Sequence, residues 1–348
     1  MGVLNAAAVG RAALDTQRTR FTQHKAEVAE LPDGQYRNWT DTSATSGLSD
    51  NLRLDQIQTV ATHNSYISRP NMVQNFLLGI GAPHRTAALQ YAHPPLWDQL
   101  DAGVRSIELD VRVHTDGTFS ISHAPVTANG GNSVDFLLAL DEIALWSASH
   151  TGHLPISILL EFKADYAFLD WTLAEFEPEI FAALDDAISD RFGSSLMRPQ
   201  ALLGEANTLN DMALSHGWPT IGDTRGKVMF VMYPNEKYRA LYEQRPLRDR
   251  TIFSSVDGLS QSADRDDVAF IIQDVPQATL IRELVTNGYI VRTRADTDLQ
   301  ISPDERDAAL ASGAQIVSTD FPGYAPQTAT GYGVDFGADK FSRPRPAW

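Results

Sequence analysis

Short apolar runs alternate with amphipathic stretches along most of the chain. The runs are rich in Val and Ile, which is typical of strands, and they lie at 57–62, 104–113, 118–122, 155–162, 227–232, 268–272, 289–293 and 314–319. Helical patterns fall between them at 94–103, 133–150, 172–192, 276–288 and 303–313. Several strands are nearly all apolar, which suits a parallel sheet buried on both faces. Eight strands joined mostly by helices therefore predict a (β/α)8 barrel of the TIM type, with an open layered sheet as the alternative.

The first part of the chain has a different pattern. Residues 1–50 are polar and rich in turn formers, so they predict an N-terminal extension with one helix. Residues 51–348 show no internal repeat and no low-complexity linker, so they predict a single barrel domain. The total length of 348 residues fits one large α/β barrel beside such an extension.

Charge and cysteine content exclude several classes of function. A net charge of −16 at pH 7 argues against a basic surface, so no nucleic-acid partner is expected and attraction to anionic membranes is disfavoured. The chain has no cysteine, which excludes disulfides, thiolate metal sites and cysteine nucleophiles. The N-terminus has no basic segment followed by a long apolar core, so no signal peptide is expected within this sequence.

Chemically active side chains gather where the predicted strands end, and a barrel of this type carries its active site at that end. They are His63 and Asn64 after the first strand, Glu108 and Asp110 in the second, His123 after the third, and Glu161 and Lys163 at the fourth. Glu108 and Asp110 are two residues apart, so their side chains point to one face. His63 and Asn64 are neighbours, so both reach one site only if the strand breaks there.

Three carboxylates that converge from apolar strands are costly unless a cation joins them. Together with the Asn64 amide they form an all-oxygen donor set, which favours Ca²⁺, with Mg²⁺ second, over zinc. His63 and His123 then serve as acid–base groups beside the ion. If the two histidines were ligands instead, a transition metal would fit better.

Ordinary ion pairs are the alternative for each of these residues. Glu108 and Asp110 could pair with Arg105 and Arg112. Glu161 could likewise pair with Lys163. The position of all the candidates at strand ends favours a shared site over separate ion pairs.

Six blocks of the sequence resemble a known family. They are "THNSY", "YAHPPLWDQLDAGVRSIELDV", "GHLPISILLEFK", "GWPTIGDTRGKVMFV", "GYIVRTRAD" and "GAQIVSTDFP", and they run in order from about residue 57 to residue 323. Block after block they are similar to the bacterial and fungal calcium-dependent phosphoinositide phospholipases C. The resemblance implies a barrel enzyme that uses Ca²⁺ to cleave an inositol phosphodiester.

Carried over residue by residue, the resemblance implies a ligand set and a reaction. The Ca²⁺ ligands would be Asn64, Glu108, Asp110 and Glu161. His63 and His123 would flank the scissile phosphate. The inositol 2-hydroxyl would attack the phosphodiester, with Glu108 or Asp110 as the base, and release diacylglycerol and a cyclic inositol phosphate.

Cations at the same rim are the candidate contacts of the substrate phosphate. Lys163 comes first, followed by Arg292 and Arg294, which share one face; a salt bridge to Asp296 or Asp320 is the alternative for the two arginines. Tyr66 and His93 are weaker candidates for the substrate pocket. The connection 67–93 carries the apolar segment "MVQNFLLGIG", which suits a lid, a membrane-docking element or an ordinary buried helix.

Beyond Lys163 and the two arginines the sequence shows no cluster of phosphate-binding residues, which favours unphosphorylated phosphatidylinositol as substrate, at a transient membrane surface. Phosphorylated and glycosylated inositol lipids and soluble inositol phosphodiesters share the reacting centre and stay open. We expect a monomer and an exported protein, while a cytoplasmic location stays open. A glycerophosphodiester phosphodiesterase is the alternative enzyme, because "HTDGTFSISHAP" contains a similar turn; those enzymes typically have Arg where Asn64 stands. A noncatalytic Ca²⁺- or lipid-binding barrel is the alternative of another class.

Overall fold

Eight parallel strands form a closed barrel in the computed structural model, which describes residues 2–35, 48–68, 91–123, 131–165, 167–258, 266–296, 301–338 and 340–347. The barrel strands are β1 (Ile57–Thr62), β2 (Ser106–His114), β4 (Ile156–Phe162), β6 (Val228–Met232), β7 (Ile252–Asp257), β8 (Val268–Ile272), β9 (Ile290–Arg294) and β10 (Ile316–Thr319). Each pairs in parallel with the next, and β1 closes the barrel by pairing with both β10 and β2. The predicted TIM-type barrel is confirmed.

Two strand predictions need correction. The run at 118–122 was counted among the eight strands, but β3 (Phe119–Ile121) pairs antiparallel with the far end of β2 and lies outside the barrel. The missing barrel strand is β7, whose sequence "IFSSVD" carries two serines in its middle. Ser255 is buried and its hydroxyl donates to the Met232 carbonyl, so this polar residue satisfies its hydrogen bonding inside the protein.

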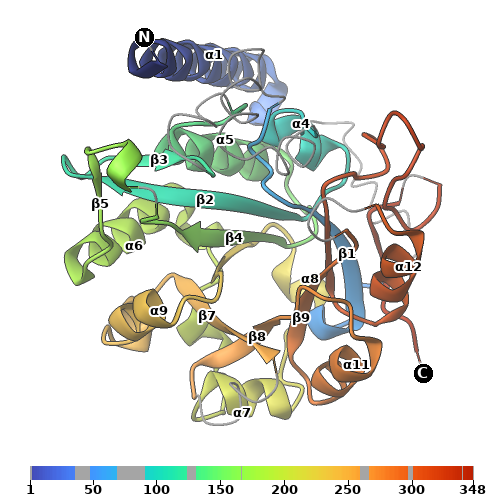
Figure 1. The fold of residues 1–348 in the computed structure, drawn as a ribbon. Helices are drawn as coiled ribbons and strands as arrows, with labels where there is room; N and C mark the ends of the chain where they lie inside the picture. Colours follow the sequence, from blue (N-terminus) through green and yellow to red (C-terminus); the bar gives the residue numbers. More distant parts are fainter. Residues whose placement is uncertain are drawn as a thin grey trace.

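Helices cover the outside of the barrel (Figure 1). They are α4 (Leu96–Asp101), α5 (Phe136–Ser149), α6 (Pro178–Phe192), α7 (Leu209–Leu214), α8 (Ile221–Thr224), α9 (Glu236–Tyr242), α11 (Ala278–Thr286) and α12 (Pro303–Ala311). Short 3-10 turns occur at Pro32–Gly34, Leu54–Gln56, Ala167–Leu169, Gly193–Ser195, Pro199–Leu202 and Leu247–Asp249. The predicted helix at 172–192 begins only at Pro178, because β5 (Leu173–Ala174) first pairs with β2.

The predicted helix of the extension is α1 (Gly2–Glu30), which lies across α5 in Figure 1. At the other end of the chain, β11 (Ser342–Pro344) pairs antiparallel with β1. The division at residue 50 stays a prediction. Among the described residues, no helix combines the length and the apolar character needed to cross a membrane.

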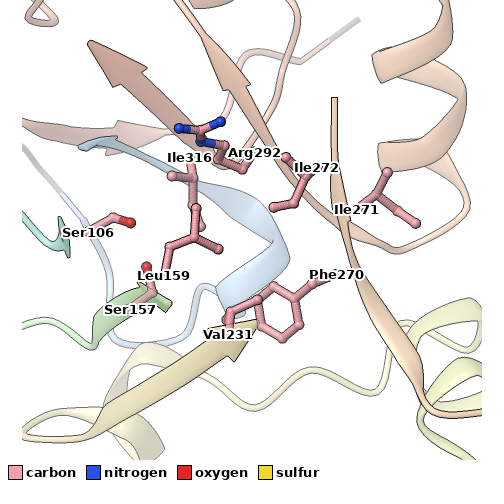
Figure 2. Close-up of a pocket in the computed structure, with 9 residues that line it drawn as sticks. All are labelled: Ser106, Ser157, Leu159, Val231, Phe270, Ile271, Ile272, Arg292 and Ile316. Atoms are coloured by element: carbon pink, nitrogen blue, oxygen red, sulfur yellow. The ribbon is translucent and has the colours of Figure 1, made fainter. Parts of the chain in front are cut away.

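The barrel interior changes from apolar to charged along its axis. A cavity of about 10 Å³ lies near its middle, which is about the space of one water molecule. Figure 2 shows its lining, made by Ser106, Ser157, Leu159, Val231, Phe270, Ile271, Ile272, Arg292 and Ile316. Because side chains alternate along a strand, the inward positions beyond Ser106 on β2 are Glu108 and Asp110. The charged residues therefore begin where the apolar filling ends, at the carboxyl ends of the strands.

Candidate active site

Three carboxylates meet at the carboxyl ends of β2 and β4. Asp110 and Glu161 are register neighbours on the paired strands, and Glu108 precedes Asp110 by one full alternation. One carboxylate oxygen from each of the three lies within 4.8 Å of the others. The predicted convergence of these acids is therefore present in the structure.

The backbone conformation of Asn64 explains how the adjacent residues His63 and Asn64 can both reach one site. Its φ of 46° lies in the left-handed region, which Asn tolerates better than most residues, and β1 ends at Thr62. The chain thus turns between His63 and Asn64 instead of continuing as a strand. The Ser65 hydroxyl fixes this turn, since it accepts from the Glu108 amide at 2.9 Å and lies 2.6 Å from the Thr62 hydroxyl.

Asp110 is fully buried, and the Lys163 ammonium and the Tyr66 hydroxyl bond its carboxylate. The Lys163 ammonium lies 3.0 Å from Asp110 Oδ2 and 3.2 Å from Glu161 Oε1, so it offsets part of their charge. Burial raises the pKa of Asp110 and of Glu161 even so. Burial also raises the pKa of Glu108 to about 8, against the opposing charge of Arg292. The cluster thus holds more negative charge than the cations around it satisfy.

His63 is held through its Nδ1 atom. Asp320 Oδ1 lies 2.6 Å from Nδ1, while Nε2 faces Glu108 Oε1 at 3.7 Å. Burial and the nearby charges of Arg294 and Arg292 lower the pKa of His63 well below its usual value. A neutral imidazole that donates Nδ1–H to Asp320 keeps a lone pair on Nε2, directed toward the carboxylates.

The two arginines of β9 occupy different places. Arg292 is only 3% exposed; its guanidinium donates to Glu108 Oε2 at 2.6 Å and also bonds Asp274. Arg294 stands one alternation closer to the barrel mouth, 3.6 Å from Asp320 Oδ2 and 3.3 Å from His63 Nδ1. Asp320, one of the two acids expected as alternative ion-pair partners, is thus the neighbour of Arg294 in the structure. The substrate contact of both arginines stays a prediction, and Arg294 is the better placed.

The remaining candidates also lie around this site. His93 is buried and its Nε2 lies 2.9 Å from the His63 carbonyl oxygen, so it supports the backbone of the turn. The Tyr66 hydroxyl lies 3.4 Å from Asn64 Oδ1. His123 ends the β3 hairpin, where its carbonyl accepts from Arg112 Nη2 at 2.8 Å, and burial lowers its pKa to about 4. Most of the connection 67–93, with its apolar segment, lies outside the described residues.

Sequence reasoning missed three residues of this site. Asp320 follows β10 directly, and its place at a strand end was the available signal. Asp274 follows β8 by two residues and gave the same signal. Tyr91, whose hydroxyl lies 3.1 Å from Asn64 Nδ2 and 3.3 Å from His63 Nδ1, begins the block "YAHPPL" that also carries His93, and that place was its signal.

Comparison with known proteins agrees with this arrangement. The family model described as "Phosphoinositide phospholipase C, Ca2+-dependent" matches residues 52–133 and 118–346. The chain belongs to this family. It is therefore an enzyme of the phosphoinositide phospholipase C type, and Ca²⁺ is its cofactor. Among curated protein sequences none matches this phospholipase C.

Solved structures of bacterial enzymes share its fold. A Ca²⁺-dependent phosphatidylinositol-specific phospholipase C from Streptomyces antibioticus is 18% identical with a TM-score of 0.60, and the match covers 85% of this chain and 100% of that one. A calcium-dependent enzyme from a Pseudomonas species, in complex with myo-inositol, is 20% identical with a TM-score of 0.59 over 88% of this chain and 100% of its own. At these identities the likeness concerns the fold alone.

The residues present fit a Ca²⁺ ion. Asp110 is fully buried and shares the single Lys163 ammonium with Glu161, Glu108 has one oxygen not bound by Arg292, and all the donors are hard oxygens. Bringing a divalent ion to this cluster would remove the repulsion that raises the carboxyl pKa values. The ligand set implied by the resemblance, Asn64, Glu108, Asp110 and Glu161, stays a prediction, and the three carboxylates of this set lie together in the structure.

Proposed function

We propose that this phospholipase C cleaves phosphatidylinositol by attack of the inositol 2-hydroxyl on the phosphodiester, which gives diacylglycerol and a cyclic inositol phosphate. The observation that supports it is a neutral His63 beside the cluster of three acids, at the mouth of a barrel of this family. Bound Ca²⁺ supplies positive charge that stabilises the developing negative charge at the phosphate and acidifies the hydroxyl.

His63 is the proton acceptor that this geometry favours. Its Nδ1–H donates to Asp320, so Nε2 is free to take the proton of the attacking hydroxyl. Glu108 and Asp110, the bases expected from the resemblance, then serve mainly as oxygen ligands. Glu108 suits that role because Arg292 already binds its other oxygen.

His123 is the proposed acid that protonates the departing glycerol oxygen. Its pKa of about 4 reflects burial first and the positive charge of Lys163 second. An anionic phosphodiester beside the imidazole would raise this pKa toward neutrality, because an opposite charge favours the protonated form. Lys163 and Arg294 are the cations that would contact the phosphate in this arrangement.

We also propose that the enzyme works at a transient membrane surface. Among the described residues, four large apolar side chains are strongly exposed: Phe168 at 83%, Trp171 at 87%, Val275 at 50% and Leu214 at 47%. Phe168 and Trp171 follow β4, and Val275 follows β8. These three lie beyond the carboxyl ends of their strands, at the same end as the site, where exposed aromatic rings suit a lipid–water interface.

Phosphorus NMR of products tests the reaction. We expect wild-type protein to form a cyclic inositol phosphate from phosphatidylinositol in Ca²⁺ and none in EGTA, and His63→Ala to form none in either. An acyclic glycerol phosphate as first product would favour the glycerophosphodiesterase alternative. Ca²⁺ binding without turnover of any inositol phosphodiester would contradict the proposed reaction.

A further inference from the structure

Helix α1 lies outside the matched family region, which begins at residue 52, yet it bonds a loop of the barrel. Gln17 of α1 is fully buried, and its Oε1 accepts from the amides of Val134 at 2.9 Å and Asp135 at 3.0 Å. Its Nε2 donates back to the Asp135 carbonyl at 3.1 Å. One side chain of the helix thus bonds three backbone groups of segment 131–135: it is the acceptor of the two amides, and it shares the Asp135 carbonyl with the Ala139 amide.

Arg20, one turn further along α1, forms the second contact. Its Nε and Nη2 bind the two carboxylate oxygens of Glu142 at 2.7 and 3.0 Å, and Nη2 also donates to the Asn132 carbonyl at 2.8 Å. Glu142 is 1% exposed, so burial raises its pKa, and Arg20 opposes that rise. A bidentate bond to a buried carboxylate fixes the guanidinium, and with it the position of Asn132.

Asn132 connects this contact to the active site. Its Nδ2 lies within hydrogen-bond distance of three carbonyl oxygens, those of Ser65 at 3.2 Å, His93 at 3.1 Å and Pro94 at 2.9 Å, which share its two hydrogens. Its backbone amide donates to the Tyr66 carbonyl at 2.7 Å. Asn132 thus joins the turn that carries His63 and Asn64 to the segment that carries His93.

We propose that α1 is a positioning element of the active site, acting through Gln17, Arg20 and Asn132 on the turn 63–66. Asn132 can hold three acceptors at once only if segment 131–135 stays in place, and the contacts of Gln17 and Arg20 keep it there. The ligand Asn64 and the base His63 sit on the turn that Asn132 holds. The effect on turnover rests on the proposed function, whereas the effects on the turn and on Ca²⁺ binding do not.

A double variant tests this inference without leaving a buried charge unpaired. Arg20→Met/Glu142→Met replaces the ion pair by apolar side chains, which protein interiors tolerate, and removes the bond to the Asn132 carbonyl. Gln17→Ala removes the other contact. Arg18→Ala is the control, because Arg18 is an exposed arginine on the same helix.

Three measurements are made on the full-length variants. Hydrogen exchange should speed up at the amides of Ser65, Ile67 and His93, which are hydrogen-bonded in the turn. Calorimetric Ca²⁺ affinity should weaken about tenfold, as for loss of a residue that orients a ligand. The kcat should fall about tenfold with KM within about twofold, while Arg18→Ala matches wild type.

A purely structural role of α1 would give a different result. The melting temperature would fall while exchange in the turn, Ca²⁺ affinity and kcat stayed at wild-type values, and that outcome would overturn the proposal. If the wild-type protein cleaves no inositol phosphodiester, the proposed function fails, but the exchange and calorimetry measurements still decide the role of α1.

Discussion

Asp320 determines which nitrogen of His63 carries the proton. The 2.6 Å contact between Asp320 Oδ1 and His63 Nδ1 places that proton on Nδ1 and leaves Nε2 as the acceptor. We expect Asp320→Asn to lower kcat by about 10²-fold or more, because an amide can donate to Nδ1 and so favour the wrong tautomer. The Ca²⁺ affinity should stay within about twofold, since Asp320 is not among the expected ligands.

Steady-state kinetics together with Ca²⁺ calorimetry measure these effects. Asp257→Asn is the control, since Asp257 is an exposed acid at the end of β7. A kcat for Asp320→Asn equal to that of the control would show that His63 is not the base.

Asp296 links the site to the pH dependence of stability. It is buried beside Asp320, accepts from the Asp320 amide at 2.8 Å and from the Thr319 hydroxyl, and has its pKa raised to about 7 by burial and by the Asp320 charge. The folded-state pKa lies above the ordinary value of 3.8, so the protonated form stabilises the fold fully below about pH 4. This contribution is lost as the pH rises through about 7.

We therefore expect the melting temperature of the wild type to fall relative to that of Asp296→Asn between pH 5 and pH 8, because the unfolded carboxyl is already ionised at pH 5 whereas the folded one loses its proton only near pH 7. The neutral amide keeps the shape of the side chain and does not titrate. Thermal melts at a series of pH values measure the difference. A difference that does not change with pH would mean that Asp296 titrates outside this range.

At the scale of single elements, the strand pattern predicted most of the barrel, and its two errors have physical causes. "TFSIS" has the alternation of a strand, but alternation does not reveal which neighbour a strand pairs with, and β3 forms a hairpin on β2. "IFSSVD" was missed because Ser254 and Ser255 interrupt an apolar run, yet both are buried. Strands with hydroxyl residues inside a barrel lack the apolar signal on which the prediction depended.

The position of the candidate residues at strand ends was enough to predict most of the site. A parallel barrel brings all carboxyl ends of its strands together, so Glu108, Asp110 and Glu161 converge whatever the details of packing. The roles of Tyr91 and Asn132 depend on where irregular segments return to the barrel. No periodicity in the sequence reports that, so the role of Asn132 could not be predicted, and Tyr91 was marked only by its place in the block "YAHPPL".

Gly288 shows how an element at the opposite end of the barrel depends on one residue. It ends the turn after α11 with a φ of 92°, and a Cβ there would lie 2.0 Å from the Ala213 carbonyl oxygen. We expect Gly288→Ala to reduce the free energy of unfolding by about 1–2 kcal/mol for the left-handed backbone and a further ~1–3 kcal/mol for the overlap. Gly288 lies before the start of β9, whereas the site lies at the other end of that strand. The kcat of the folded enzyme should therefore not change.

Gly226→Ala separates the two costs of that substitution. Gly226 also has a positive φ, 72°, but the nearest atom to its Cβ position is 4.0 Å away. Denaturant unfolding should therefore show only the backbone cost there, about 1–2 kcal/mol. Equal losses at the two glycines would mean that the chain around Ala213 moves aside without cost.

At the scale of the whole molecule, three of the four strongly exposed large apolar side chains among the described residues lie at one end of the barrel, while the chain as a whole carries a charge of −16. Attraction by anionic lipid is therefore weak, and insertion of aromatic rings is the remaining source of membrane affinity. Phe168 and Trp171 lie on one side of the barrel mouth, in the β4 connection that also carries Lys163, and Val275 extends from the β8 connection. A bilayer touching both sides would lie across the mouth.

We expect Phe168→Ala/Trp171→Ala to weaken binding to phosphatidylcholine vesicles containing phosphatidylinositol about tenfold or more, because two aromatic rings no longer leave water at the interface. Turnover of a soluble inositol phosphodiester should stay at the wild-type rate, since both side chains are more than four-fifths exposed (Phe168 83%, Trp171 87%). Leu214→Ala is the control: its side chain is 47% exposed, but it lies on α7, which leads toward the start of β6 at the opposite end of the barrel. Vesicle sedimentation measures binding, and the double variant binding vesicles as tightly as Leu214→Ala would move the membrane contact away from this rim.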